Sequence, residues 1–295
     1  MSEVLRSLLF IPGNNPGMIQ NASVFDADGI IFDLEDAVSL EEKDAARTLI
    51  SMALKTFDLS PKKIMVRVNP LNSVWGPEDV LRIASCHPDA ILLPKADEKA
   101  IEACGKLLDE VEKNKGFEAN SIRIFALIET AFGLEHAREI VDASSRLDGI
   151  LLGGEDYTAD MQIVRTREGL ELSYARARLA NLCKAYGLQF IDTPFTDVDD
   201  FEGLTFDIQE AIRWGATGKA AINPRQIERI QHAFMPTQKD ILWAKEVLEA
   251  WSEAKKQGKG VCSLHGKMID SPVVVRAEKI LENVMAYRQK EEALS

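Results

Sequence analysis

Two carboxylates stand at the ends of two apolar segments in the middle of the chain. Residues 125–128 end at Glu129, and residues 149–152 lead into Asp156. Short runs rich in Ile and Leu are typical of strands buried on both faces of a parallel sheet. Because such strands end on one edge of the sheet, Glu129 and Asp156 are predicted to lie together. Two carboxylates there could hold a hard divalent cation such as Mg²⁺, with positions left open for a substrate.

The choice between Glu155 and Asp156 rests on strand geometry. Adjacent residues of a strand point to opposite faces, so only one of the two is expected to face the site, and Asp156 is predicted to be the ligand. The alternative is that Glu129 and Asp156 cap the following helices or pair with arginine. The capping alternative fits Glu129 poorly, because Glu is a weak N-cap residue.

Arg67 lies in an otherwise apolar segment, residues 64–69. An arginine keeps its charge when buried and must therefore meet an anion. One interpretation is an ion pair with Asp33 or Glu35; the other is a guanidinium that binds a substrate carboxylate or a developing oxyanion. Both hold if a carboxylate orients the arginine. The acidic run 33–36 is accordingly either a cluster that orients Arg67 and metal-bound water or a solvated turn.

Three further segments carry weaker signals. Pro12, Gly13 and Asn14 begin a turn-rich loop whose backbone N–H groups could bind phosphate or carboxylate. Lys95 follows another apolar run, where it could contact a substrate. Asp270 lies in a segment of extended pattern near the C-terminus, and the pattern alone predicts an ordinary surface residue.

The elements that must position these residues alternate between apolar runs and segments of helical periodicity. The expected strands are residues 7–11, 29–34, 64–68, 90–93, 122–128, 149–152, 188–191 and 220–222, and the clearest helices between them are 41–54, 98–111, 135–144, 171–186 and 201–214. Eight strand–helix repeats favour an α/β fold, the (β/α)₈ TIM barrel, whose chemistry lies at the C-terminal ends of the strands. No Gly-x-Gly-x-x-Gly follows the first strand, which argues against a dinucleotide-binding fold.

The sequence predicts two regions, a barrel domain over residues 1–235 and a C-terminal helical extension over 236–295. In the extension, residues 239–256 are expected to be helical, 261–270 extended, and about 272–290 helical, with Ser271 as the cap. This part is too short for a strong core of its own, so we expect it to act as a lid or to pack on a neighbouring subunit.

Composition narrows the class of protein. The chain has 295 residues, 46% of them hydrophobic, and a formal net charge of −12, which disfavours nucleic acid and anionic membrane surfaces as partners. Its four cysteines form no C-x-x-C pair and are expected to be free thiols. The N-terminal apolar run is too short for a signal peptide, and no segment approaches the length of a membrane span, so a cytoplasmic protein is expected.

Several of these segments together resemble the citrate lyase beta-chain family, within the HpcH/HpaI superfamily of Mg²⁺-dependent acyl-thioester lyases and aldolases. The segments are LLFIPGN (8–14), FDLEDAV (32–38), VRVN (66–69), LPK (93–95), ALIET (126–130), LGGEDY (152–157), INPRQI (222–227) and VCSLHGKMID (261–270). The match runs nearly end to end. His265 departs from the pattern, because the family often carries Asn there.

The resemblance implies a barrel that assembles as a homotrimer or higher oligomer. It also implies metal binding by Glu129 and Asp156, with Arg67 as the substrate and oxyanion residue and Glu129 also contacting the substrate. Asp270 becomes a candidate acid/base that closes over the site of an adjacent subunit.

The activity implied is Mg²⁺-dependent cleavage of a citryl thioester to oxaloacetate and an acetyl thioester. The chain would be the beta subunit of citrate lyase, with a transferase (alpha) subunit and an acyl carrier protein as partners. A free-standing CoA-thioester lyase for citramalyl-CoA or malyl-CoA is the alternative. A catalytically silent barrel that scaffolds a complex is a third possibility and predicts no metal binding. The sequence leaves open whether the acyl group is carried by the carrier protein or by CoA.

Overall fold

The structure is a computed structural model that describes residues 3–294. The chain divides into two compact units. The larger spans Leu5–Gln231, and the smaller runs from His232 onward together with Glu3 and Val4.

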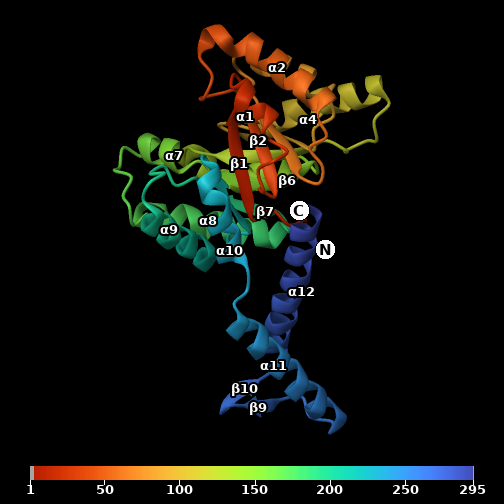
Figure 1. The fold of residues 1–295 in the computed structure, drawn as a ribbon, viewed down its shortest axis with the longest axis vertical. Helices are drawn as coiled ribbons and strands as arrows, with labels where there is room; N and C mark the ends of the chain where they lie inside the picture. Colours follow the sequence, from red (N-terminus) through yellow and green to blue (C-terminus); the bar gives the residue numbers. More distant parts are fainter. Residues whose placement is uncertain (1–2, 295) are drawn as a thin grey trace. The chain divides into compact units, whose positions relative to one another are not determined.

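The larger unit is built on eight parallel strands that close into a barrel in sequence order, with β8 paired to β1 (Figure 1). The expected TIM-barrel fold is therefore confirmed. The strands are β1 (Ser7–Pro12), β2 (Gly29–Asp33), β3 (Lys63–Arg67), β4 (Ala90–Leu93), β5 (Arg123–Ile128), β6 (Leu147–Leu152), β7 (Gln189–Asp192) and β8 (Gly218–Ala221).

Helices follow the strands. They are α1 (Pro16–Gln20), α2 (Lys43–Thr56), α3 (Gly76–Ala84), α4 (Glu98–Lys115), α5 (Ala131–Glu135), α6 (Ala137–Asp142), α7 (Gly154–Asp160), α8 (Ser173–Tyr186), α9 (Phe201–Trp214) and α10 (Ile227–Phe234), with short 3₁₀ turns at Leu40–Glu42, Leu170–Leu172 and Pro224–Gln226. The ends follow local chemistry: the Asp97 side chain accepts from the backbone N–H of Ala100 at the start of α4, and left-handed Gly116 ends the helix. The helix expected over 135–144 is present as the shorter α6, which begins at Ala137 because the backbone leaves the helical region at His136, and α5 before it was not predicted.

Large apolar side chains fill the interior of the barrel. They belong to one buried cluster, which comprises Leu5, Leu8, Ile31, Met65, Ala90, Leu92, Phe125, Leu127, Leu151, Ile191 and Ala220. Phe125 fits because its neighbour on β6 is Gly149: a Cβ there would lie 2.3 Å from the Phe125 ring. The interior is thus filled by side chains, as is usual for this fold.

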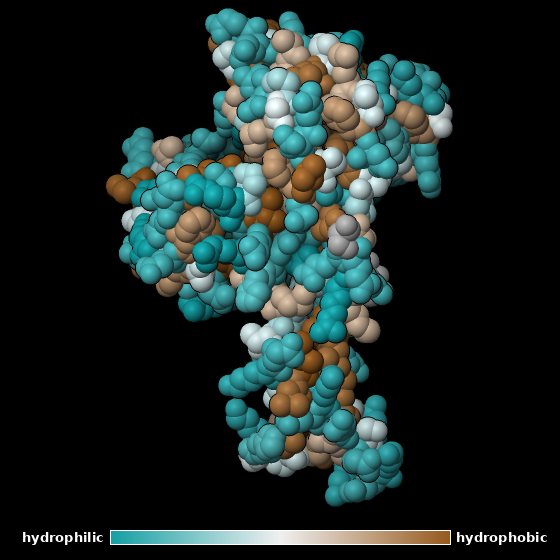
Figure 2. Space-filling view, viewed as in Figure 1, coloured by the Kyte–Doolittle hydropathy of each residue, from teal (hydrophilic) through white to brown (hydrophobic). Residues whose placement is uncertain are grey.

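The smaller unit contains α11 (Gln238–Lys256), the hairpin β9 (Cys262–Leu264) and β10 (Lys267–Ile269), and α12 (Ser271–Leu294). Its helices share an apolar cluster, and brown side chains gather along α11 and α12 in Figure 2. The prediction that Ser271 caps the last helix is wrong. Ser271 is already helical, and the Asp270 carboxylate takes the capping role by accepting from the N–H of Val273 at 3.4 Å.

The described residues bear on two further expectations. All four cysteines are free thiols, and Cys104 and Cys183 are buried. Among residues 3–294, no helix combines the length and the apolar character needed to cross a membrane.

Candidate metal and substrate site

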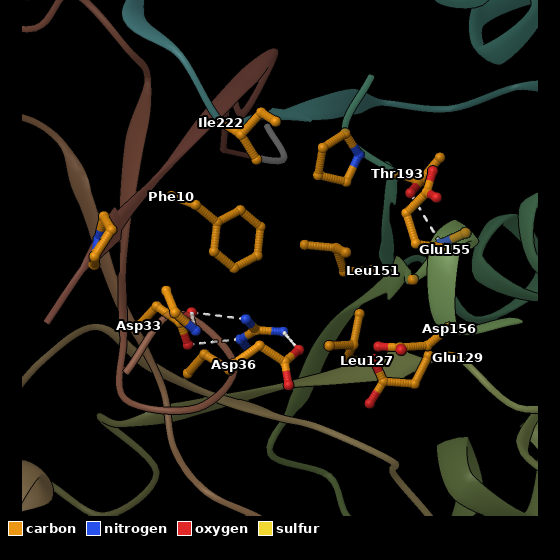
Figure 3. Close-up of a pocket in the computed structure, with 16 residues that line it drawn as sticks. Phe10, Asp33, Asp36, Leu127, Glu129, Leu151, Glu155, Asp156, Thr193 and Ile222 are labelled. Carbon is orange, nitrogen blue, oxygen red and sulfur yellow. Dashed lines mark hydrogen bonds and ion pairs between the residues drawn. The ribbon is translucent and has the colours of Figure 1, made fainter. Parts of the chain in front are cut away.

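A cavity of about 410 Å³ opens in the barrel unit, at the edge where the strands end (Figure 3). Its lining comprises Phe10, Pro12, Asp33, Asp36, Ala37, Arg67, Leu127, Glu129, Leu151, Gly153, Gly154, Glu155, Asp156, Thr193, Pro194 and Ile222. One side of the cavity is apolar, with Phe10 and Leu151 projecting into it. The rest is dominated by carboxylates.

Glu129 leaves the end of β5 and is only 1% exposed. Thr130, not Glu129, caps α5, since its hydroxyl accepts from the N–H of Gly133. One oxygen of Glu129 accepts from the backbone N–H of Lys95 at 2.7 Å, and Lys95 adopts a left-handed backbone (φ 47°) to present it. Burial and the nearby charges of Glu35 and Asp156 raise the pKa of Glu129 to about 8. A bound cation would therefore stabilise the ionised form of Glu129.

Asp156 and Glu155 both line the cavity, so the prediction that only one can face it is wrong. The reason is that α7 begins at Gly154, and the two residues occupy its first turn instead of a strand. The tight approach of this turn depends on Gly153, where a Cβ would lie 2.6 Å from the Glu129 Cβ. Figure 3 shows Asp156 on the same side of the cavity as Glu129.

Arg67, at the end of β3, is held by carboxylates. Its Nε and Nη2 both donate to Asp33 at 2.7 Å, and its Nη1 lies 3.1 Å from both Glu35 and Asp36. The guanidinium also lies over the Phe10 ring, 5.2 Å from its centroid. Burial opposes the charge of Arg67, but Asp33 and Glu35 outweigh it and raise its pKa. The acidic run therefore orients the arginine instead of forming a solvated turn.

Glu35 carries the second perturbed carboxyl at this edge. It is 5% exposed, and its Oε2 is buried without a hydrogen bond. Burial raises its pKa to about 7 even though Arg67 opposes the shift.

Charge balance tests whether a metal ion fits this cavity. Among the lining residues, five are acidic and only Arg67 is basic. Glu129 is the most buried of these five acids, and burial destabilises its ionised form. In residues 3–294, no three His, Cys, Asp or Glu side chains are grouped to hold a metal. A pair of carboxylates that leaves the remaining positions to water and substrate is typical of Mg²⁺ sites, so the residues fit such an ion.

The other predicted site residues are placed as follows. Pro12 lines the cavity. The N–H of Gly13 donates to the Asp33 carbonyl at 2.8 Å and is unavailable to a ligand, and the Asn14 side chain donates to Glu42. The Lys95 side chain is 54% exposed, with Nζ 3.8 Å from Glu35.

Asp270 belongs to the smaller unit, at the start of α12.

Sequence reasoning missed Phe10, Glu155 and Thr193 as lining residues. Phe10 is one of many apolar strand residues, and only its register at the end of β1 places it beside Arg67. The available signal for Thr193 was its position directly after β7, at a strand exit.

Fold and site together define a TIM-barrel protein with a carboxylate-rich cavity where its strands end. The family model for "HpcH/HpaI aldolase/citrate lyase" matches residues 6–224. The chain belongs to this family.

Two relatives and one solved structure give the family context. The citrate lyase subunit beta of Leuconostoc mesenteroides subsp. cremoris is 42% identical over 278 residues, covering 94% of this chain and 92% of the relative. The human mitochondrial citramalyl-CoA lyase is 30% identical over 305 residues, covering 97% and 87%. The crystal structure of Mycobacterium tuberculosis CitE with magnesium, acetoacetate and coenzyme A has a TM-score of 0.79 and 27% identity, and the match covers 95% of this chain and 98% of that one.

Proposed function

We propose that this protein is a Mg²⁺-dependent carbon–carbon lyase that cleaves a citryl thioester to oxaloacetate and an acetyl thioester. The observation that carries the proposal is the acidic cavity of a barrel whose single lining cation, Arg67, is already fixed by carboxylates. An anionic substrate enters such a cavity only together with a cation. The similarity to citrate lyase subunit beta, at 42% identity, favours citryl over citramalyl thioesters.

Glu129 and Asp156 would hold the Mg²⁺. When bound, the ion supplies a Lewis acid that stabilises the substrate's hydroxyl oxygen as it loses its proton. Glu129 is the better anchor of the two, because the Lys95 N–H fixes one of its oxygens. Asp156 is exposed, and its position depends on the first turn of α7.

Arg67 would stabilise the enolate oxygen that develops on the acetyl thioester as the carbon–carbon bond breaks. Its two bonds to Asp33 fix the plane of the guanidinium, so little reorganisation is needed as charge appears. Asp36 is the partner most readily displaced, because its side chain is 59% exposed. The apolar side chains of Phe10 and Leu151 exclude water from the same space.

Asp270 is proposed to accept the proton that leaves the substrate hydroxyl and to return it to the enolate carbon, as a residue supplied by a neighbouring copy of the chain in a homotrimer or higher oligomer. Mixing inactive Asp270→Ala with inactive Glu129→Ala protein tests this role. Activity is expected to return in the mixed oligomers, because some sites then combine an intact Asp270 with an intact Glu129. Failure to recover any activity would refute the cross-subunit role.

The primary test is product analysis with purified protein, Mg²⁺ and three thioesters: citryl, citramalyl and malyl. Cleavage of the citryl thioester to oxaloacetate is expected, with loss of activity on chelation and in Arg67→Ala and Glu129→Ala. Wild-type turnover in either variant would refute the site. Preference for the citramalyl or malyl thioester would establish the alternative lyase, whereas absence of Mg²⁺ binding would favour a scaffold protein.

The carrier of the acyl group is tested separately. We propose that a transferase (alpha) subunit and an acyl carrier protein are the partners. Co-purification with these subunits, and a higher kcat/KM for citryl-carrier protein than for citryl-CoA, are the expected results.

A further inference from the structure

Four charged side chains form a buried cluster behind strands β7 and β8, on the opposite side of the sheet from the barrel interior. They are Arg176, Asp192, Asp207 and Lys219, and the side chain of each is at most 1% exposed. Ile191 belongs to the interior cluster, so its neighbour Asp192 points the other way, toward α8 and α9. Two cations and two carboxylates give the cluster no net charge.

Lys219 is the centre of this cluster. Its Nζ donates to Asp192 at 2.7 Å, to Asp207 at 2.6 Å and to the backbone carbonyl of Thr193 at 2.6 Å. All three ammonium protons thus have acceptors. Burial raises the pKa of Asp207, but Lys219 and Arg176 outweigh it and lower the value to about 2, so the carboxylate stays charged. Lys219 therefore fixes the position of Thr193, the residue directly after β7.

Thr193 connects the cluster to the cavity. Its hydroxyl accepts from the N–H of Gly154 at 2.9 Å, and this N–H belongs to the first residue of α7. The two residues are in close contact, because a Cβ on Gly154 would lie 2.9 Å from the Thr193 hydroxyl oxygen. Asp156 follows two residues later. The Thr193 hydroxyl thus fixes the turn from which Asp156 projects.

Arg165 forms a second connection to the same turn. Its Nε lies 3.2 Å from Glu155 and its Nη2 lies 3.9 Å from Asp207, while its Nη1 donates to Glu171 at 2.8 Å. Asp207 therefore meets the first turn of α7 by two routes, through Lys219 and Thr193 and through Arg165.

We propose that Lys219 and Thr193 are positioning residues that set where Asp156 stands at the metal site. Lys219 acts from behind the barrel wall, by holding Thr193, and Thr193 acts through the N–H of Gly154. The inference rests on the proposed function, in which Asp156 binds Mg²⁺. Neither residue is required to touch the ion. Loss of the connection lets the first turn of α7 move and weakens metal binding.

The test compares Mg²⁺ affinity, measured by calorimetry with saturating oxaloacetate, with the midpoint of thermal unfolding. Thr193→Val removes the hydroxyl with little change in shape, Thr193→Ser keeps it, and Lys219→Met removes the ammonium group. Asp28→Asn is the matched control, because it weakens another buried pair, in which Arg6 Nε lies 2.9 Å from Asp28 before the start of β2.

Thr193→Val and Lys219→Met are expected to raise the Kd for Mg²⁺ by about 10–100-fold, the range for partners that orient metal ligands. Thr193→Ser should restore the wild-type Kd, and Asp28→Asn should lower the unfolding midpoint without changing the Kd. A wild-type Kd in Thr193→Val would overturn the inference, even if Lys219→Met does not fold. Equal weakening by Asp28→Asn would overturn it too, as a general effect of stability. Absence of Mg²⁺ binding by the wild type would instead refute the proposed function, and the inference with it.

Discussion

The pH dependence of Mg²⁺ binding follows from the raised pKa of Glu129. In the metal-free protein this pKa is about 8, because the carboxyl is buried near the charges of Glu35 and Asp156. Magnesium needs the ionised carboxylate as a ligand, so binding must displace the proton. Roughly one Glu129 in ten is ionised near pH 7 and roughly one in a hundred near pH 6.

The magnitude of the effect follows directly. The Kd for Mg²⁺ should fall about tenfold for each pH unit between about pH 6 and 8, and should become constant above the pKa of Glu129. Near pH 7 the uptake of each ion should release close to one proton. Calorimetry in buffers of different ionisation enthalpy measures both the Kd and the number of protons released.

Two variants separate Glu129 from other titrating groups. Glu129→Gln cannot titrate at this position, so its Mg²⁺ binding should be weak and should lose the slope. Glu35→Gln removes a like charge that raises the Glu129 pKa, so the plateau should begin at a lower pH. A wild-type Kd that is constant from about pH 6 to 8, or binding without proton release near pH 7, would refute the reasoning.

Three further outcomes are expected. Arg67→Ala should lower kcat by about 10²–10³-fold in steady-state assays, as for loss of one oxyanion contact, and an unchanged kcat would exclude that role. Arg146 and two backbone N–H groups outweigh burial and lower the pKa of Glu112 to about 2, so its stabilising effect should be present above about pH 4.5 and be lost as the pH falls toward 2. Acid unfolding of Glu112→Gln should accordingly show a shallower pH dependence than the wild type. Gly218→Ala should prevent folding, because the added Cβ would lie 1.8 Å from the Leu5 carbonyl, and a soluble, folded variant by circular dichroism would contradict this packing.

The barrel was predictable because its strands are short, apolar and regularly separated by helices. The same logic placed Arg67 and Glu129, since a charged group inside or directly after a buried strand must meet an opposite charge or a ligand. The structure bears out the ion-pair interpretation of Arg67 with Asp33 and Glu35. Its role toward a substrate stays a prediction.

The predictions failed where the chain changes from one type of element to another. Strand alternation was applied to Glu155 and Asp156, but the helix had already begun at Gly154. Ser271 was chosen as a cap although Asp270, also a good capping residue, precedes it. Element boundaries depend on contacts such as the bond from Gly154 to Thr193, which join residues distant in the sequence and leave no local pattern.

The buried ion pairs of Lys219 could not be predicted from hydrophobic periodicity alone. It stands in a four-residue strand, Gly218–Ala221, and the reasoning used for Arg67 would have required a buried anion near it. The identity of that anion was not accessible, because Asp207 comes from α9 and Asp192 from the neighbouring strand. Only the packing of α9 against the barrel brings these charges together.

Charge balance distinguishes the two clusters of this barrel. Behind β7 and β8, two cations and two carboxylates satisfy one another, and such a cluster needs no ligand. In the cavity, five acidic residues face a single arginine, and burial together with the charges of Glu35 and Asp156 raises the pKa of Glu129 although Arg67 opposes the shift. A buried excess of like charge destabilises the fold unless a proton or a metal ion compensates it. This excess of negative charge lies at the strand ends, where a substrate can enter. Mg²⁺ would supply the positive charge that balances it.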